Sequence, residues 1–287
     1  MNHANPSDLY YPMFIYSWGV FSVGLPVSFL AVYGLYFQIK ADHVTPVYVI
    51  NLLISDVLQL CAKPTFLSIP PLGMVYELMV FIYALGLLSS TMFMVCIAAE
   101  RYCMIAHPVW FRFRREIKNS IFVSFCVWLV AMATVTIVVL SGLAGIVDVR
   151  KLLLATMILS LLPYPFVLFF FMGTWRALSM SIALSRHERR RILGILAFVL
   201  CVYTVLFLPH MVVILILYIK PAFMKSVNMQ LTTIVTDFIL CLNPLVDPVL
   251  YVLMRKDKRN VLPSTFYAHH FVWCVLMWHM TNGTSLL

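Results

Sequence analysis

A few ionisable side chains lie within long apolar stretches of the chain, where a buried charge is costly. They are Asp56, Lys63, Glu77, Glu100, Arg101, His210, Asp237 and Asp247. In apolar surroundings, side chains of these types pair with one another, bind an ion, or take up and release a proton. They are therefore the first candidates for functional residues.

Two of the aspartates, Asp56 and Asp247, are expected to lie close together inside these stretches. Asn243 precedes Asp247 by four residues and so shares its face of a helix. Two neighbouring carboxylates repel each other unless a proton or a cation lies between them. The sequence leaves two interpretations open: these side chains are structural polar contacts between helices, or they hold a sodium ion or an exchangeable proton.

A second group of polar side chains is expected to face a cavity in the outer half of the bundle: Lys63, Tyr83, His210, Thr233 and Asp237. Lys63 and Asp237 either pair with each other, because an unpaired charge there costs several kcal/mol, or leave Lys63 to bind a phosphate or carboxylate. His210 is either a packed polar residue or a proton sensor. The packed residue is favoured, because few histidines are expected on the outer face.

The composition indicates that membrane-spanning helices position these residues. The chain has 287 residues, of which 63% are hydrophobic and only 11% charged, with a mean hydropathy of +0.96. A soluble domain usually carries about 25% charged residues, so a soluble enzyme, a disordered chain and a secreted disulfide-rich module are excluded. No nucleophile–base pair or metal-ligand spacing stands out, and an enzyme is the least expected function.

Seven apolar stretches reach the length of about 20 residues that crosses a bilayer as a helix. They cover residues 13–39, 45–70, 77–106, 120–142, 152–178, 191–219 and 227–254. The sequence therefore predicts an all-α fold, a bundle of seven transmembrane helices. No internal repeat is visible, which removes the usual support for a transporter built from inverted repeats.

Most of the 20 lysines and arginines lie after the first, third and fifth stretches or in the C-terminal tail. The positive-inside rule then places the N-terminus outside and the C-terminus inside. We expect an extracellular N-terminus at 1–12, a bundle at 13–254 and a cytoplasmic tail at 255–287 with a segment lying along the membrane. The net charge of +9 is explained without nucleic acid as a partner.

Motifs on six of the stretches together resemble the rhodopsin-like (class A) G-protein-coupled receptors, most closely the nucleotide, lysolipid and proton-sensing branch. The resemblance covers about residues 15–258. It is carried by Asn51-Leu52 with Asp56, Ser90, Glu100-Arg101-Tyr102, Trp128, Pro163, Phe207-Leu208-Pro209-His210 and Asp247-Pro248-Val249-Leu250-Tyr251. Phe207 stands where the family usually has tryptophan, and Asp247 stands where it usually has asparagine.

The resemblance implies a multi-pass protein of the plasma membrane. It implies an extracellular small-molecule or lipid ligand, contacted by Tyr83, His210 and Asp237, and a heterotrimeric G protein on the cytoplasmic face. The residues implied in activation and coupling are Glu100, Arg101, Tyr102, Phe207, Pro209 and Tyr251. Those implied to coordinate sodium are Asp56, Ser90, Asn243 and Asp247, and no other cofactor is expected. Membrane lipids are further partners, because cytoplasmic basic residues bind anionic headgroups.

The sequence departs from the family pattern in ways that keep two other functions open. Both cysteines of the family's usual outer-loop disulfide are missing here. Tyr76 stands at one cysteine position, and the loop from Ser141 to Lys151 has no cysteine. Phe171 replaces a tyrosine that helps the active state. These losses are typical of a degenerated receptor that does not signal. A bundle that conducts or transports cations or protons through Asp56 and Asp247 is the other alternative.

Overall fold

The computed structural model describes residues 6–42, 47–69, 73–107, 117–145, 148–180, 186–220, 222 and 227–250. Within these ranges the chain is helical and contains no strand. Seven of the helical stretches are long and apolar enough to cross a membrane, which confirms the predicted bundle. The predicted tail at 255–287 and Tyr251 lie outside the described residues. The direction in which the bundle crosses the membrane stays a prediction from the basic residues.

The first four spans are continuous helices. They are α1 (Pro6–Asp42), α2 (Val47–Ser68), α3 (Met74–Ala106) and α5 (Ile117–Leu143). Each contains most or all of one predicted stretch, and α1 begins well before the first stretch. An unbroken helix satisfies its own backbone groups, which is the condition for crossing a bilayer.

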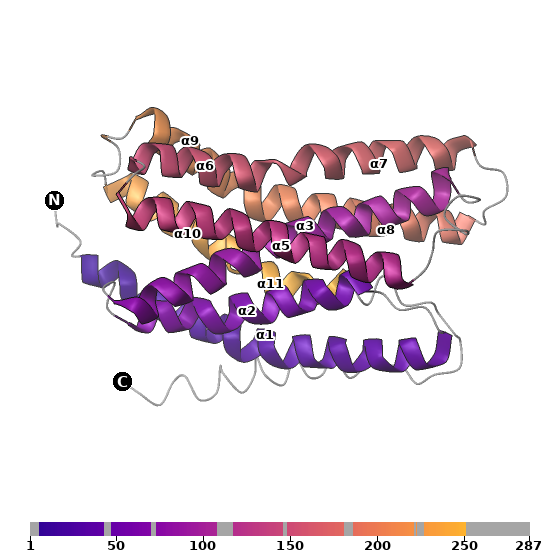
Figure 1. The fold of residues 1–287 in the computed structure, drawn as a ribbon, viewed down its shortest axis with the longest axis horizontal. Coiled ribbons are helices and arrows are strands. Elements are labelled where there is room, and N and C mark those ends of the chain that lie inside the picture. The colour runs from indigo at the N-terminus through magenta and orange to yellow at the C-terminus, as the bar shows by residue number, and fades with distance from the viewer. Residues whose placement is uncertain are drawn as a thin grey trace. The chain divides into compact units, whose positions relative to one another are not determined.

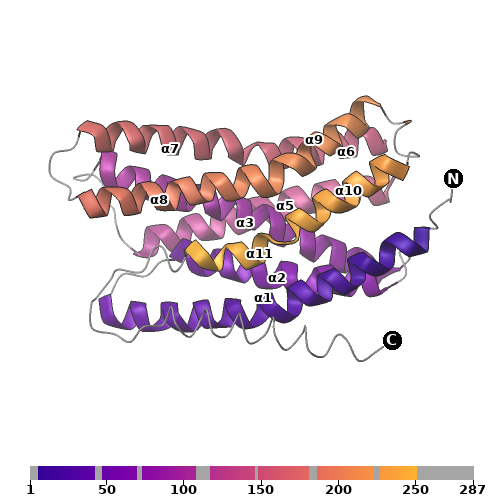
Figure 2. The same ribbon diagram turned by 180° about the vertical axis from the view of Figure 1, so that it is seen from behind.

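The last three spans are each interrupted. The fifth consists of α6 (Val149–Leu161) and α7 (Pro163–Met180), which follow one another in Figure 1. The sixth consists of α8 (Arg186–Val202), a π-helical turn η1 (Tyr203–Phe207) and α9 (Leu208–Ile219). The seventh consists of α10 (Val227–Leu240), a short turn and α11 (Asn243–Val246), visible end to end in Figure 2.

Proline accounts for the position of these interruptions. Pro163, Pro209 and Pro244 each lie at the start of the helix that follows the break. A proline has no N–H to give to the preceding turn, and its ring clashes with that turn, so helices break or bend before it. The carbonyl groups left without a helical donor become available to side chains of neighbouring spans.

The buried core lies between α2, α3, α5 and the sixth span. Its fully buried side chains include Leu52, Phe93, Ile97 and Phe207. α2 packs most extensively against α3 and also against α1. A polar contact adds to this packing, because the indole Nε1 of Trp128 on α5 donates to Asn51 Oδ1 on α2 at 2.9 Å.

Gly86 allows the close approach of α2 and α3. A Cβ atom at this position would lie 2.8 Å from the Ser55 backbone oxygen and 2.9 Å from Gln59 Cγ. The first of these atoms belongs to the backbone of α2, so it cannot move aside without shifting that helix. Ser55 precedes Asp56 and Gln59 donates a hydrogen bond to it, so the close contact at Gly86 lies beside this carboxylate.

We expect Gly86→Ala to lower the free energy of unfolding by about 1–3 kcal/mol, the usual cost of overpacking. Thermal unfolding of the purified protein in detergent measures this effect. Gly19→Ala on α1 is the matched control, since a Cβ there meets no atom within 4 Å. Equal melting temperatures for the two variants would contradict the close α2–α3 contact.

Candidate functional site

Asp56 and Asp247 are both completely buried and lie within interaction range of each other and of the Ser90 hydroxyl. Asp56 comes from α2, Ser90 from α3, and Asn243 and Asp247 from the seventh span. Ser90 Oγ donates to Asp247 Oδ2 at 3.2 Å, and Asn243 Nδ2 donates to Ser90 Oγ at 3.1 Å. The structure thus brings together the four residues that the sequence grouped as an ion site.

Gln59 is a fifth member of this cluster that the sequence did not single out. Its Nε2 donates to Asp56 Oδ1 at 3.3 Å and to the Ser55 carbonyl at 3.4 Å. Gln59 follows Asp56 by three residues, so helical spacing puts both on one face of α2. That spacing was the available signal, but an uncharged glutamine did not stand out among the polar residues of the chain.

Three buried oxygens of the cluster accept no hydrogen bond within the described structure: Asp56 Oδ2, Asp247 Oδ1 and Asn243 Oδ1. A buried carboxylate or amide oxygen without a donor costs free energy. Oxygens of this kind are the ligands that hard cations prefer. The residues therefore fit a monovalent cation, which would satisfy these oxygens and offset the repulsion between the two carboxylates.

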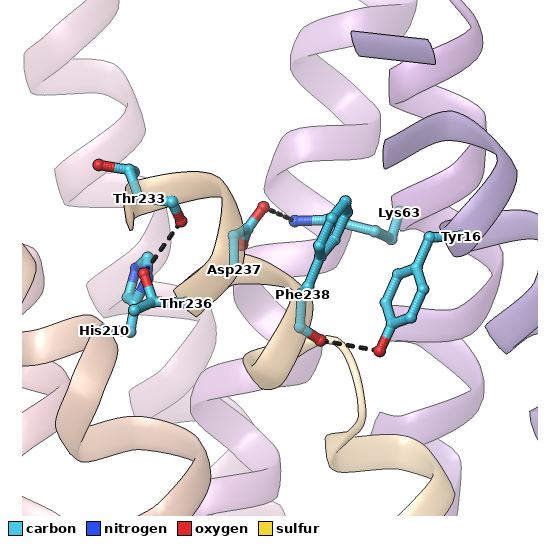
Figure 3. Close-up of polar contacts among 7 residues, drawn as sticks. All are labelled: Tyr16, Lys63, His210, Thr233, Thr236, Asp237 and Phe238. Carbon is cyan, nitrogen blue, oxygen red and sulfur yellow. Dashed lines mark hydrogen bonds and ion pairs between the residues drawn. The ribbon is translucent and has the colours of Figure 1, made fainter. Parts of the chain in front are cut away.

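Lys63 on α2 and Asp237 on α10 form an ion pair, with Lys63 Nζ 2.7 Å from Asp237 Oδ2 (Figure 3). The side chains are 6% and 19% exposed. Lys63 Nζ also lies 4.6 Å from the centre of the Tyr83 ring on α3, a favourable cation–π distance. The sequence left open whether Lys63 pairs with Asp237 or binds a ligand. In the structure the two residues form a pair.

The same stretch of α10 contacts two further spans. Thr236 Oγ1 lies 3.5 Å from Nδ1 of His210 on α9, and it donates to the Thr233 carbonyl at 2.9 Å. The Tyr16 hydroxyl on α1 donates to the Phe238 carbonyl at 3.1 Å, as Figure 3 shows. Consecutive residues of α10 thereby hold α1, α2 and α9. Thr236 was missed in the sequence because a lone threonine in an apolar helix is common.

A cavity of about 170 Å³ lies between the third, fourth, fifth and sixth spans, with one residue contributed by α10. Its walls are formed by Ala84, Leu87, Leu88, Thr91, Val135, Val138, Val139, Leu159, Ser160, Phe207, His210, Met211, Ile214 and Leu240. Of the five side chains predicted to contact a ligand, only His210 lines it. Lys63 and Tyr83 line a separate space of about 10 Å³, the size of one water molecule.

The sixth span is joined to the fifth beside this cavity. Phe207 is fully buried and stacks on Tyr203, with ring centres 4.8 Å apart and planes at 14°. The Tyr203 hydroxyl donates to the Ser160 carbonyl on α6. Ser160 and Phe207 both line the cavity, so an occupant would touch both ends of this link. The sequence offered no signal for Tyr203, which reads as an ordinary core aromatic.

Glu100, Arg101 and Tyr102 lie together near the C-terminal end of α3, all partly buried. The Tyr102 ring packs against Phe170 on α7, with ring centres 5.7 Å apart. Along α3 (Met74–Ala106), these three residues lie far from Ser90 and Tyr83. A signal that passes from the cavity to Arg101 must therefore travel along the bundle.

Residues 28–251 match the family described as 7 transmembrane receptor (rhodopsin family). This chain belongs to that family. The resemblance drawn from the sequence motifs is thereby confirmed, and the chain is a G-protein-coupled receptor that spans the plasma membrane several times. The family also implies an extracellular signal and a G protein as partner.

The receptor is also similar to individual members of the family. It is 24% identical to proteinase-activated receptor 2 of Rattus norvegicus over 271 residues, which cover 84% of this chain and 68% of the relative. It is 32% identical to a purinoceptor of Xenopus laevis over 117 residues, 38% of this chain and 22% of the relative. It is 32% identical to G-protein coupled receptor 68 of Homo sapiens over 123 residues, 38% of this chain and 32% of the relative.

We expect Lys63→Met to destabilise the receptor by about 3–5 kcal/mol, because it leaves the Asp237 carboxylate without its ammonium partner in a mostly buried site. Asp237→Asn should act in the same direction. The double variant should lose much less than the sum of the two. Thermal unfolding in detergent or nanodiscs gives the four values of this double-mutant cycle.

Lys151→Met provides the control for loss of a lysine, since Lys151 is exposed on α6. Its melting temperature should match that of the unmodified receptor. Strictly additive losses at Lys63 and Asp237 would show that the ion pair contributes nothing to stability.

Proposed function

We propose that the receptor binds a small extracellular molecule in the 170 Å³ cavity and signals to a heterotrimeric G protein at the end of the bundle that carries Arg101. The proposal includes the topology predicted from the basic residues, with the N-terminus outside and the C-terminus inside. The observation that supports it best is that the cavity lies against the sixth span at its π-helical turn.

A ligand at this position contacts the least regular part of the sixth span. Phe207, His210 and Met211 all lie at the junction of η1 and α9 and line the cavity. π-Helical turns occur often at functional sites, because their backbone can convert to α-helical geometry. An occupant that displaces Phe207 also displaces Tyr203, which stacks on it and bonds to Ser160. A local contact thus changes how the fifth and sixth spans meet.

The proposed output is at the cytoplasmic end of α3 and α8. Arg101 would become available to the G protein when α8 moves away, with Glu100 and Tyr102 beside it. Arg189 and Arg190 begin α8 and add positive charge to the same face. These bases suit both a G protein and anionic lipid headgroups, so we include membrane lipids as partners at this face.

The cation-binding cluster is proposed to hold sodium in the resting receptor. Asp56, Ser90, Asn243 and Asp247 would supply oxygen ligands from the second, third and seventh spans. The ion would supply positive charge between two carboxylates and so favour the arrangement in which these spans meet. Lys63, Tyr83, Thr233 and Asp237 are proposed to support the ligand site from α2, α3 and α10 rather than to line it.

Nucleotide exchange on a panel of purified G proteins, with the receptor in nanodiscs, tests this function. We expect the receptor to accelerate exchange on at least one G protein, and Arg101→Ala to remove that acceleration. Arg176→Ala is the matched control, since Arg176 is exposed on α7 and carries the same charge. It should leave exchange unchanged.

Two outcomes would overturn the proposal in different directions. Absence of exchange on every G protein, together with measurable cation flux in sealed vesicles, would favour a conducting or transporting bundle. Absence of both activities in a correctly folded receptor would favour a degenerated receptor that does not signal.

A further inference from the structure

The walls of the cavity are apolar except at three residues. Thr91, Ser160 and His210 contribute polar atoms from the third, fifth and sixth spans. The Thr91 hydroxyl donates to the Leu88 carbonyl at 2.8 Å, so its proton is already used. The Ser160 hydroxyl can rotate and either donate or accept, so it does not discriminate between ligands. Thr91 Oγ1 can still accept a hydrogen bond, and His210 is the third polar group of the wall, with a role that depends on its tautomer.

The contacts of Thr236 determine which ring nitrogen of His210 carries the proton. A threonine hydroxyl has one proton, and Thr236 donates it to the Thr233 carbonyl at 2.9 Å. Thr236 Oγ1 lies 3.5 Å from His210 Nδ1 and can therefore only accept a hydrogen bond from it. A neutral ring that donates from Nδ1 has an acceptor at Nε2. The neutral ring is also the form that suits an apolar wall.

His210 lines the cavity, so an occupant can supply the partner of Nε2. Across the described part of the chain, Thr236 is the residue that hydrogen-bonds the His210 ring. A ligand with a hydroxyl or N–H group can donate to Nε2, whereas a ligand that only accepts cannot. The cavity therefore favours one polarity of ligand at this position.

The volume sets the size of the ligand. Drug-sized pockets usually occupy about 300–1,000 Å³, and this cavity has about 170 Å³. An apolar cavity of about 150 Å³ accommodates one benzene molecule. The space thus matches a single ring with a small substituent.

We infer that the ligand of this cavity is a neutral, single-ring-sized apolar molecule that donates one hydrogen bond to His210 Nε2. This inference rests on the proposed function for the location of the site and adds the chemical class of the occupant. Thr236 is a positioning residue, because it acts through the His210 ring.

Binding of three small probes to the full-length receptor in nanodiscs tests this inference without a G protein. Phenol donates a hydrogen bond, fluorobenzene has nearly the same shape and does not donate, and benzaldehyde only accepts. Ligand-observed NMR gives the affinities, with empty nanodiscs subtracting partition into lipid. We expect phenol to bind about tenfold more tightly than fluorobenzene, the value of one net hydrogen bond. Benzaldehyde, which cannot donate to His210, should bind less tightly than phenol.

Substitutions test which residues cause the preference for phenol over fluorobenzene. His210→Leu should reduce the phenol preference and leave fluorobenzene binding, and His210→Gln should restore part of it through the amide oxygen. Thr236→Val should weaken the preference, since Nδ1 loses its acceptor. Val138→Phe fills the cavity and should abolish binding of both probes. Val130→Phe, on the exposed face of the same helix, should change neither.

Two results would overturn the inference, and they separate it from the proposed function. Equal affinities for phenol and fluorobenzene, both lost in Val138→Phe, would leave the ligand site in place and reject the donor requirement. Binding that is unaffected by Val138→Phe would reject the cavity itself as the ligand site. Nucleotide exchange through Arg101 is measured independently of either result.

Discussion

Burial of the Asp56 and Asp247 carboxylates is the constraint on which the centre of the bundle depends. Both are completely buried among membrane-spanning helices, where an ionised carboxylate is costly. Ser90, Asn243 and Gln59 contribute hydrogen bonds from three spans. Asn243 and Asp247 follow the turn after α10 and are four residues apart, so they share one helix face. The absence of a side chain at Gly86 brings α2 and α3 close enough to form this cluster.

The interior has two sides of different chemistry. Between α2, α3 and the seventh span it is polar, with the carboxylate cluster and the Lys63–Asp237 ion pair. Between the third, fourth, fifth and sixth spans it is apolar and contains the cavity. His210 and Thr236 join the two sides at 3.5 Å. Because Lys63 and Asp237 are paired and hydrogen bonds join the carboxylate cluster, we propose that these charges stabilise the resting bundle and that the apolar side binds the ligand.

The sequence predicted the seven spans from their apolar length. In the ion cluster, the buried charges indicated Asp56 and Asp247, helical spacing added Asn243, and the resemblance to the family added Ser90. It left the Lys63–Asp237 pair open, since spacing along the chain does not show whether two helices meet at the same depth. A ligand cavity was expected with Lys63, Tyr83, His210, Thr233 and Asp237 facing it, and of these His210 lines the observed cavity. Its walls are ordinary valines and leucines, and only packing decides which of them leave space between them. The breaks in the last three spans lie just before prolines, but the sequence does not show that the break in the sixth span is a π-helical turn, Tyr203–Phe207.

The most direct test of this account is the thermal stability of the receptor in sodium against N-methylglucamine at constant ionic strength. The account predicts a melting temperature that rises with sodium and saturates, as expected for an ion that binds the folded state. Asp56→Asn should remove this dependence, and Asp148→Asn, an exposed aspartate, should retain it. Equal melting temperatures in the two cations, or a sodium dependence that persists in Asp56→Asn, would contradict it.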